Sequence, residues 1–325
     1  MPYTIDELIK KVDDQISELE IAGDPKELYL PVEYCLKNGG KRVRPLLTLI
    51  ACDMFGGSVS KAMPLAVGLE IFHNFTLMHD DIMDQAPIRR GKPAVHKKWD
   101  TNTAILSGDV MFALAYQYML KSPEKSLKQI LEVFNETVMQ VCEGQQYDMN
   151  FETIDNVTEA EYLNMIRLKT AVLPASCLKI GAIVAEAPEN EIQNLYLFGE
   201  LFGLGFQLKD DWLDVFGDEE VFGKKTGGDI VANKKTWLYI KAFELADSKQ
   251  NKKLKEAFSN QIHHPEEKIN TVKNIYLQLG LNDLAVEHME KYYKRAFDYL
   301  EKIKMPEESK SNLAYLINKL IERKS

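Results

Sequence analysis

The chain has 325 residues, of which 45% are hydrophobic and 27% are charged, so it can bury a large core in one big domain or in two ordinary ones. Its formal net charge of −9 argues against nucleic acid as a general partner. No stretch reaches the roughly 18 apolar residues of a membrane span, and the start of the chain lacks the basic and apolar regions of a signal peptide. We therefore expect no membrane span and no secretion.

The four cysteines, Cys35, Cys52, Cys142 and Cys177, stand singly in apolar helical contexts. Neither a C-x-x-C pair nor a disulfide-dense spacing is present. This usage predicts reduced thiols in the core of a cytoplasmic protein.

The first part of the chain is typical of helices. Thr4 or Asp6 can cap an amphipathic helix over about 5–20, and a second helix is expected from about Pro31 to Lys37. The nearly continuous apolar run at 46–55 fits a buried helix that ends at two glycines.

An acidic cluster dominates the next stretch, from Leu65 to Gly91, where Asp80, Asp81 and Asp84 form a D-D-x-x-D pattern. On an ideal helix these positions lie at about 0°, 100° and 40° around the axis, so the three carboxylates share one narrow arc. Their neighbours are mostly apolar, and an acidic cluster in such a setting needs a counter-ion.

The remaining chain continues in long helical patterns, and Pro174 predicts a kink in one of them. The pattern at 189–216 repeats the acidic motif at Asp210, Asp211 and Asp214. The segment 217–236 is too long for an ordinary connection, which makes it a candidate lid. Helices are expected over 102–121, 123–150, 158–186, 189–216, 237–246, 252–258, 266–280, 282–304 and 307–323.

Neither an alternating strand pattern nor a repeat or linker marks a domain boundary. We therefore expect an all-α protein in which residues 1–325 form a single domain, a helical bundle with a central cavity. The two acidic motifs would then come from helices on opposite walls of that cavity.

The six aspartates are hard oxygen ligands without clustered His or Cys, and they suit Mg²⁺, with Mn²⁺ as the alternative. Magnesium shares its shell with phosphate oxygens, which points to a phosphorylated substrate. One D-D-x-x-D alone is more often an exposed or capping turn. Two copies, one followed by Arg89 and Arg90 and the other by a lysine-rich loop, favour a diphosphate site instead. The glycine motifs of P-loop and dinucleotide sites are absent.

The chain resembles the trans-isoprenyl diphosphate synthases of the polyprenyl synthetase family, which includes farnesyl and geranylgeranyl diphosphate synthases. The resemblance covers nearly the whole chain and implies an isoprenoid-synthase bundle, a homodimer, and condensation of isopentenyl diphosphate with an allylic diphosphate such as dimethylallyl, geranyl or farnesyl diphosphate. The motifs that carry it are GGKRVRP at 39–45, HNFTLMHDDIMDQAPIRRG at 73–91, SGD at 107–109, GQQYD at 144–148, LKT at 168–170, GFQLKDDWLD at 205–214 and GKKTGGDIVANKKT at 223–236.

The resemblance also implies roles for individual residues. Isopentenyl diphosphate would be held by Lys41, Arg44, His73 and Arg90. The allylic diphosphate would be held by Arg89, Lys169, Thr170, Gln207, Lys224 and Lys234, and magnesium ions would bridge it to Asp80, Asp81, Asp84 and Asp210, with Asp211 and Asp214 in support. The chain departs from many relatives at Asn233, where they have glycine, in a loop one residue longer than in some of them.

Product length in this family is set by bulky residues on the helix below the first aspartate. Phe75 lies five residues before Asp80, a rise of about 7.5 Å, whereas Thr76 lies nearly beneath that aspartate and Phe72 points between the two. We expect Phe75 to form the floor of the pocket and the product to be geranylgeranyl diphosphate, with farnesyl diphosphate as the alternative.

The sequence leaves two other functions open. A terpene cyclase would share the bundle and one acidic motif, but such enzymes replace the second D-D-x-x-D by an Asn/Ser/Glu motif and need no isopentenyl site. A non-catalytic helical subunit of a heteromeric prenyl synthase would be expected to lose its charged motifs, and here they are intact.

Overall fold

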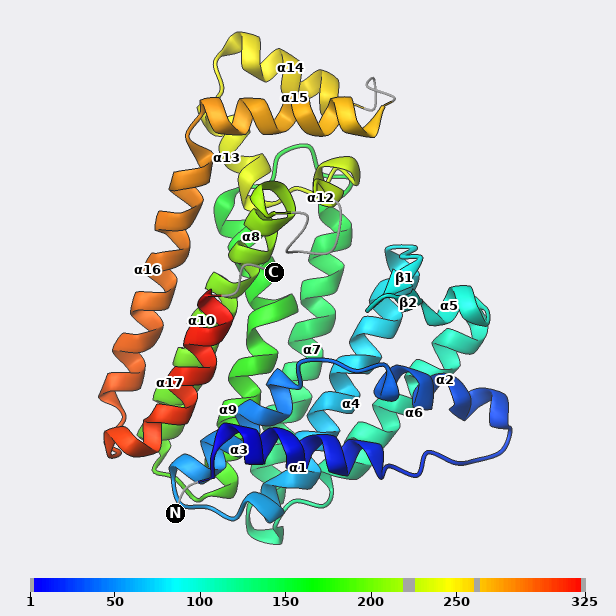
Figure 1. Ribbon diagram of the computed structural model, residues 1–325, viewed down its shortest axis with the longest axis vertical. Helices are drawn as coiled ribbons and strands as arrows, with labels where there is room; N and C mark the ends of the chain where they lie inside the picture. Colours follow the sequence, from blue (N-terminus) through cyan, green and yellow to red (C-terminus); the bar gives the residue numbers. More distant parts are fainter. Residues whose placement is uncertain (1–2, 219–225, 260–263, 323–325) are drawn as a thin grey trace. The chain divides into compact units, whose positions relative to one another are not determined.

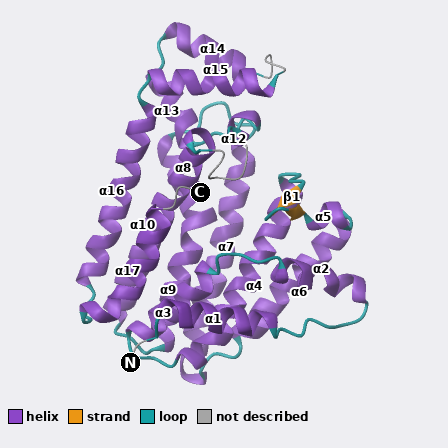
Figure 2. Cartoon of the chain, in the orientation of Figure 1, coloured by secondary structure: helices purple, strands orange, loops and turns teal. Residues whose placement is uncertain are grey.

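The computed structural model describes residues 3–218, 226–259 and 264–322, and most of these residues are helical (Figures 1 and 2). Within these ranges the only strands are β1 (Ile88–Arg89) and β2 (Lys92–Pro93), which pair antiparallel with Arg89 opposite Lys92. The all-α prediction is confirmed. Two residues per strand are too few to give an alternating pattern, which is why the sequence did not indicate this hairpin.

The chain divides into two compact units. Unit 1 contains the described residues of 1–135, 176–193 and 304–316, and unit 2 contains those of 136–175, 194–303 and 317–325. The single domain over 1–325 stays a prediction. Four helices contribute residues to both units: α7 (Leu127–Phe151), α9 (Val172–Val184), α10 (Glu189–Phe216) and α17 (Glu307–Glu322).

Unit 1 is built around α4 (Val59–Met83), which packs against α3 and α6 (Figure 1). Apolar side chains surround most of this helix, and Leu65, Leu69 and Phe72 have no exposed surface. The first acidic triplet therefore stands at the end of a well-packed helix. The other elements of the unit are α1 (Ile5–Ser17), α2 (Lys26–Lys37), α3 (Val43–Met54), α5 (Val95–Lys98), α6 (Thr101–Met119) and the 3₁₀ turn η1 (Glu124–Ser126).

The boundaries of the early helices correct three expectations. Thr4, not Asp6, caps α1 in a capping box with Glu7, and this helix ends at Ser17. The second helix begins at Lys26, not at Pro31, because a proline there removes only one backbone hydrogen bond. The third begins at Val43, before Leu46, since Pro45 falls in the first turn, where its missing N–H would have no helical partner.

Unit 2 contains a helical layer in which α14 packs on α15, and α15 contacts α12 and α16 (Figure 1). Shortly before Pro174, where the sequence predicts a kink, the structure has a π-helical turn, η2 (Arg167–Ala171), between α8 (Glu159–Ile166) and α9. The kink itself stays a prediction. The other elements are α12 (Gly228–Val231), α13 (Trp237–Leu245), α14 (Ser248–Phe258), α15 (Pro265–Gln278) and α16 (Leu281–Lys302).

All four cysteines are free, as expected, but only part of the prediction that they lie in the core is right. Cys52 and Cys177 are buried and Cys35 is half-buried, whereas Cys142 is exposed on α7. The expectation for Cys142 was wrong because this face of α7 is open to solvent, as the exposed Met139 one turn earlier also shows. No helix of the described residues is long and apolar enough to cross a membrane.

Gly144 allows α7 to lie against the π-helical turn. A Cβ at this position would come within 2.2 Å of the backbone nitrogen of Lys169. Gly144→Ala would gain about 1 kcal/mol of helix propensity but would overpack the contact at about 1–3 kcal/mol or more, and a backbone neighbour cannot move aside as a side chain can. We expect a net loss of about 2 kcal/mol in the free energy of unfolding, measured by denaturant titration. The control is Glu143→Ala, an exposed neighbour on the same helix, and equal stability of the two variants would contradict the prediction.

Candidate active site

The first acidic triplet has an arginine as its counter-ion. Asp80 and Asp81 lie in the last turn of α4, and Asp84 caps the helix end. Arg89, carried back by the β1–β2 hairpin, donates from Nε to Asp81 Oδ1 at 2.9 Å and from NH2 to the same oxygen. Its NH2 is also 3.6 Å from Asp80 Oδ2. Asp81 is buried while Asp84 is exposed, so Arg89 sets a cation beside the buried carboxylate of the cluster.

Positive charges surround His73 on α4. Burial, followed by the charges of Arg44 and Arg90, lowers the pKa of His73 well below its ordinary range, so the imidazole is neutral at pH 7. The structure thus brings together three of the residues expected to hold isopentenyl diphosphate. The fourth, Lys41, is exposed on the loop that precedes α3.

In unit 2, residues expected to hold the allylic diphosphate line one cavity of about 110 Å³. Thr170 Oγ1 donates to Gln207 Oε1 at 3.0 Å, and Gln207 Nε2 donates to Asp211 Oδ1 at 3.0 Å. Lys169 Nζ donates to Asp148 Oδ2 at 2.6 Å. The polar residues that line this cavity are Asp148, Glu152, Tyr162, Lys169, Thr170, Gln207, Asp211, Asp229, Asn233, Lys234, Lys235 and Thr236.

The second acidic triplet has no arginine partner like that of the first. Asp211 is buried, and its Oδ2 accepts a hydrogen bond from the Tyr162 hydroxyl. Burial, with the nearby charge of Asp229, raises the pKa of Asp211 to about 8. Asp214 Oδ2 accepts from the backbone N–H of Asp229 at 2.9 Å, at the start of α12. Asp210 is half-buried on the same helix.

The predicted lid is only partly described. Lys224 and its neighbours over 219–225 lie outside the described residues, and part of the remaining segment forms α12. Lys234 lines the cavity of unit 2. Lys235 donates to the carbonyl oxygens of Phe151, at 2.7 Å, and Ile154, where α7 ends.

The residues expected to set product length belong to an aromatic cluster between α4 and α6. The ring centroids of Phe75 and Phe72 are 5.7 Å apart, and those of Phe75 and Phe112 are 5.3 Å apart. Phe72 is fully buried, whereas Phe75 is half-buried. Thr76 Oγ1 donates to the His73 carbonyl at 2.8 Å, so the hydroxyl turns back toward its own helix. Phe112, on the facing helix, was not identified from the sequence.

Several polar residues of the two sites were missed. Asp148 belongs to the GQQYD motif and could have been assigned from it, because an acid near Lys169 is a natural partner. Tyr162 and Asp229 have no such signal, since Tyr162 meets Asp211 across 49 positions of the sequence. Glu70 and Asn74 on α4 were also overlooked, and they interact with Arg42 and Arg90.

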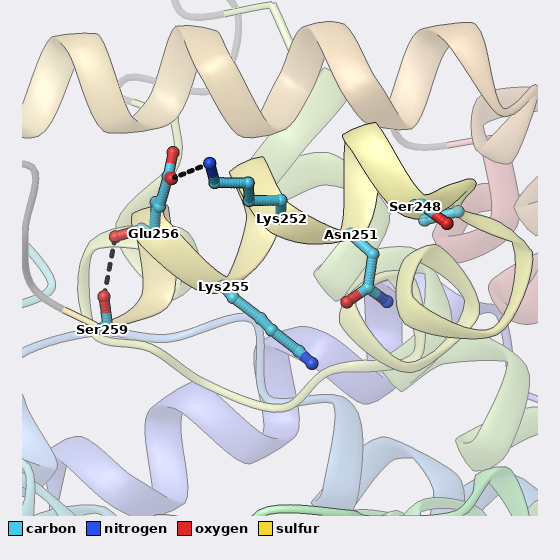
Figure 3. Close-up of a pocket in the computed structure, with 7 residues that line it drawn as sticks. Ser248, Asn251, Lys252, Lys255, Glu256 and Ser259 are labelled. Carbon is cyan, nitrogen blue, oxygen red and sulfur yellow. Dashed lines mark hydrogen bonds and ion pairs between the residues drawn. The ribbon is translucent and has the colours of Figure 1, made fainter.

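A groove of about 660 Å³ lies elsewhere in unit 2, along α14 (Figure 3). Its lining includes Lys252 and Lys255, and Lys252 Nζ lies 3.9 Å from Glu256 Oε1, one turn along the same helix. This is the usual charge pattern of a solvated helix face. None of the predicted site residues lines it.

Comparison with known proteins places this geometry in context. The sequence model of the polyprenyl synthetase family matches residues 25–276. The geranylgeranyl diphosphate synthase of Methanosarcina mazei is 44% identical over 236 residues, which are 72% of each chain. A solved geranylgeranyl pyrophosphate synthase has a TM-score of 0.94 at 44% identity, with 99% of this chain and 100% of that chain covered. A polyprenyl synthase from Caulobacter crescentus CB15, solved in complex with calcium and isoprenyl diphosphate, has a TM-score of 0.88 at 27% identity over 100% of this chain and 99% of the other.

The raised pKa of Asp211 makes a prediction about stability. Its folded-state pKa of about 8 lies above the ordinary value of 3.8, so the carboxyl favours folding while it is protonated and loses that contribution as the pH rises through this window. Asp211→Asn should remove this dependence of the free energy of unfolding on pH. It should keep the hydrogen bonds with Gln207 and Tyr162, because an amide can accept from Gln207 and donate to Tyr162. Between pH 6 and pH 8, the variant should gain about 2 kcal/mol relative to the wild type in the free energy of unfolding.

The measurement is urea denaturation at both pH values in the presence of a chelator, so that bound metal does not shift the titration. Asp298→Ala, which removes an exposed carboxylate in the same unit, is the control. If the difference in the free energy of unfolding between the wild type and Asp211→Asn stays constant from pH 6 to pH 8, the prediction is wrong.

Proposed function

Because the chain belongs to the polyprenyl synthetase family, we propose that it condenses isopentenyl diphosphate with an allylic diphosphate, giving a longer prenyl diphosphate and inorganic diphosphate. The protein is a short-chain trans-prenyltransferase. The observation that carries the proposal is the ion pair of Arg89 with the first acidic motif, because a guanidinium beside clustered carboxylates is a ready partner for a diphosphate that arrives with a metal ion. The second acidic motif argues against a terpene cyclase.

We propose that the metal is Mg²⁺, with Mn²⁺ as the alternative, and the donor set fits this choice because all six residues are carboxylates. When bound, the metal would supply positive charge against the leaving diphosphate. Among the described residues, no three His, Cys, Asp or Glu side chains gather closely enough to hold a metal ion by themselves. The ligands of the metal would be Asp80, Asp81, Asp84 and Asp210, supported by Asp211 and Asp214.

Two groups of residues would bind the two substrates. Arg89, Lys169, Thr170 and Gln207, with Lys234 and Lys224, would hold the allylic diphosphate, while Lys41, Arg44, His73 and Arg90 would hold isopentenyl diphosphate. His73 is neutral because of its lowered pKa, so it would bind as a hydrogen-bonding group and not as a cation.

In the proposed reaction, the bond between C1 and the diphosphate oxygen of the allylic substrate breaks, and both electrons leave with the diphosphate. Arg89 and Lys169 would stabilise that negative charge. The double bond of isopentenyl diphosphate then forms a new carbon–carbon bond at C1. A proton departs to restore an alkene, and the released diphosphate accepts it, so the protein supplies no base for this step.

Other features of the proposal stay predictions. The homodimer rests on the family resemblance. The closure of the loop 223–235 over bound diphosphates rests on the length of the segment 217–236 and on its lysines. The expected cytoplasmic location rests on the free cysteines. The absence of a partner nucleic acid rests on the net charge of −9.

The reaction is tested directly by incubating the purified chain with Mg²⁺, isopentenyl diphosphate and an allylic diphosphate, and by chromatography of the dephosphorylated products. A longer prenyl chain is expected, and chelation with EDTA should abolish it. Asp81→Ala should lower kcat/KM on the order of 100-fold or more, because the diphosphate then leaves with less compensating charge. Asp298→Ala, an exposed carboxylate on α16 with the same charge change, should retain activity. Turnover in excess EDTA would contradict the proposal.

Product length is tested at the aromatic cluster. Phe75→Ala should open the space between α4 and α6 and shift the products to longer chains, while the KM values for both diphosphates change less than about threefold because no cation is touched. Phe112→Ala is the matched variant on the facing helix. If Phe75→Ala leaves the product distribution unchanged and Phe112→Ala lengthens it, the floor belongs to α6.

A further inference from the structure

Two polar side chains lie inside the apolar surroundings of α4. Glu70 and Asn74 are 2% and 3% exposed, and because they are four residues apart they lie on the same face of the helix. A buried carboxylate is costly unless it is paired and hydrogen-bonded, and a buried amide needs partners for both its oxygen and its nitrogen. They are hydrogen-bonded to each other, and each also has an arginine partner from outside α4.

Arg42 is the partner of Glu70. Its NH1 donates to Glu70 Oε1 at 2.8 Å, and its NH2 donates to the Leu36 carbonyl at 2.9 Å. Both charged side chains are buried, at 6% and 3% exposure. Arg42 is the one cation of the segment 39–45 to which the family resemblance gives no role. The pair therefore serves to anchor the loop before α3 on α4.

Asn74 extends this pair toward Arg90. Its Nδ2 donates to the Glu70 carbonyl at 2.8 Å and to Glu70 Oε1 at 3.3 Å, while its Oδ1 accepts from Arg90 NH1 at 3.3 Å. The opposite amide orientation would set an oxygen against the oxygens of Glu70 and an NH₂ group against the guanidinium. The two neighbours thus fix the direction of the amide.

The hydrogen bond from Asn74 holds one nitrogen of the Arg90 guanidinium, NH1, and leaves the other two nitrogens available. NH1 also donates to the Gly39 carbonyl, whereas Nε and NH2 have no hydrogen-bond partner among the described residues. Arg89 differs, because it is paired with Asp81 and Asp80. A neutral amide can orient a guanidinium without cancelling its charge. A carboxylate in the same place would compete with an anionic ligand for it.

We propose that Asn74 and Glu70 are positioning residues for Arg90, and that the chain Arg42, Glu70, Asn74, Arg90 holds the guanidinium with its Nε and NH2 edge ready for a diphosphate. The proposal rests on the proposed function, in which Arg90 binds isopentenyl diphosphate. Asn74 itself touches neither substrate nor metal. Its loss should therefore weaken the binding of one substrate and spare the other.

Asn74→Leu, which keeps the branched shape of the side chain but cannot form its hydrogen bonds, should raise the KM for isopentenyl diphosphate about tenfold, an effect typical of losing a hydrogen bond to a charged group. The KM for the allylic diphosphate and kcat should change less than about twofold. Ser107→Ala is the control, because it removes another buried tertiary hydrogen bond of unit 1, to the Leu28 carbonyl at 2.9 Å. It should lower Tm without raising either KM. Asn74→Ala is the second variant if leucine prevents folding.

A double-mutant cycle with Arg90→Ala decides whether Asn74 acts through the arginine. Once Arg90 is absent, the Asn74 substitution should add no further increase in the KM for isopentenyl diphosphate. Independent, multiplicative effects would overturn the positioning role. If Arg90→Ala raises that KM but the Asn74 variants do not, the inference fails while the proposed function stands. If Arg90→Ala leaves the KM for isopentenyl diphosphate unchanged, the proposed role of Arg90 in binding that substrate is wrong, and the positioning role of Asn74 is wrong with it.

Discussion

Each unit of this molecule contains a buried aspartate within an acidic cluster. A buried carboxylate is costly unless it is protonated or is paired with a cation or with hydrogen-bond donors. In unit 1 the partner is an arginine, since Arg89 reaches back from the hairpin to Asp81 and Asp80. In unit 2 the same D-D-x-x-D motif is accommodated differently. There, Tyr162 and Gln207 donate hydrogen bonds to Asp211, whose raised pKa of about 8 favours the neutral form. Burial raises the pKa of Asp81 as well, but there the hydrogen bond and the charge of Arg89 oppose the shift. The two motifs thus differ in what partners the buried aspartate, a cation in one and neutral donors in the other.

This difference matters for the proposed chemistry. The first triplet already has an arginine beside it, so a metal ion that binds there must share the aspartates with Arg89. A triplet whose central residue favours its proton must release it before that residue can help to bind a metal, so binding there is coupled to pH. The family assignment of Asp211 as a supporting ligand agrees with this. Asp214 is partly committed as well, since it accepts from the backbone at the start of α12.

The sequence predicted the local features well. Helical periodicity located most helices, and the spacing of Asp80, Asp81 and Asp84 required a nearby cation, because these depend on neighbours a few positions apart. Contacts between distant positions were missed. Arg42 and Glu70 are 28 positions apart, and Tyr162 and Asp211 are 49 apart, and no pattern within either segment signals such a meeting. Errors at Pro31 and Leu46 arose because each helix contains a proline that was read as a boundary, Pro31 within α2 and Pro45 in the first turn of α3.

The cavity of unit 2 shows why an active site resists prediction from regular periodicity. On a regular α-helix the neighbours Lys169 and Thr170 would point about 100° apart, yet both line one cavity. They belong to the π-helical turn η2, whose wider backbone changes the direction of successive side chains. Gly144 permits this turn to approach α7, since any larger residue would meet the backbone of Lys169. The same helix carries Asp148, which binds the Lys169 ammonium at 2.6 Å. A close backbone contact and an ion pair therefore join the irregular turn to α7, while Thr170 is linked through Gln207 to Asp211.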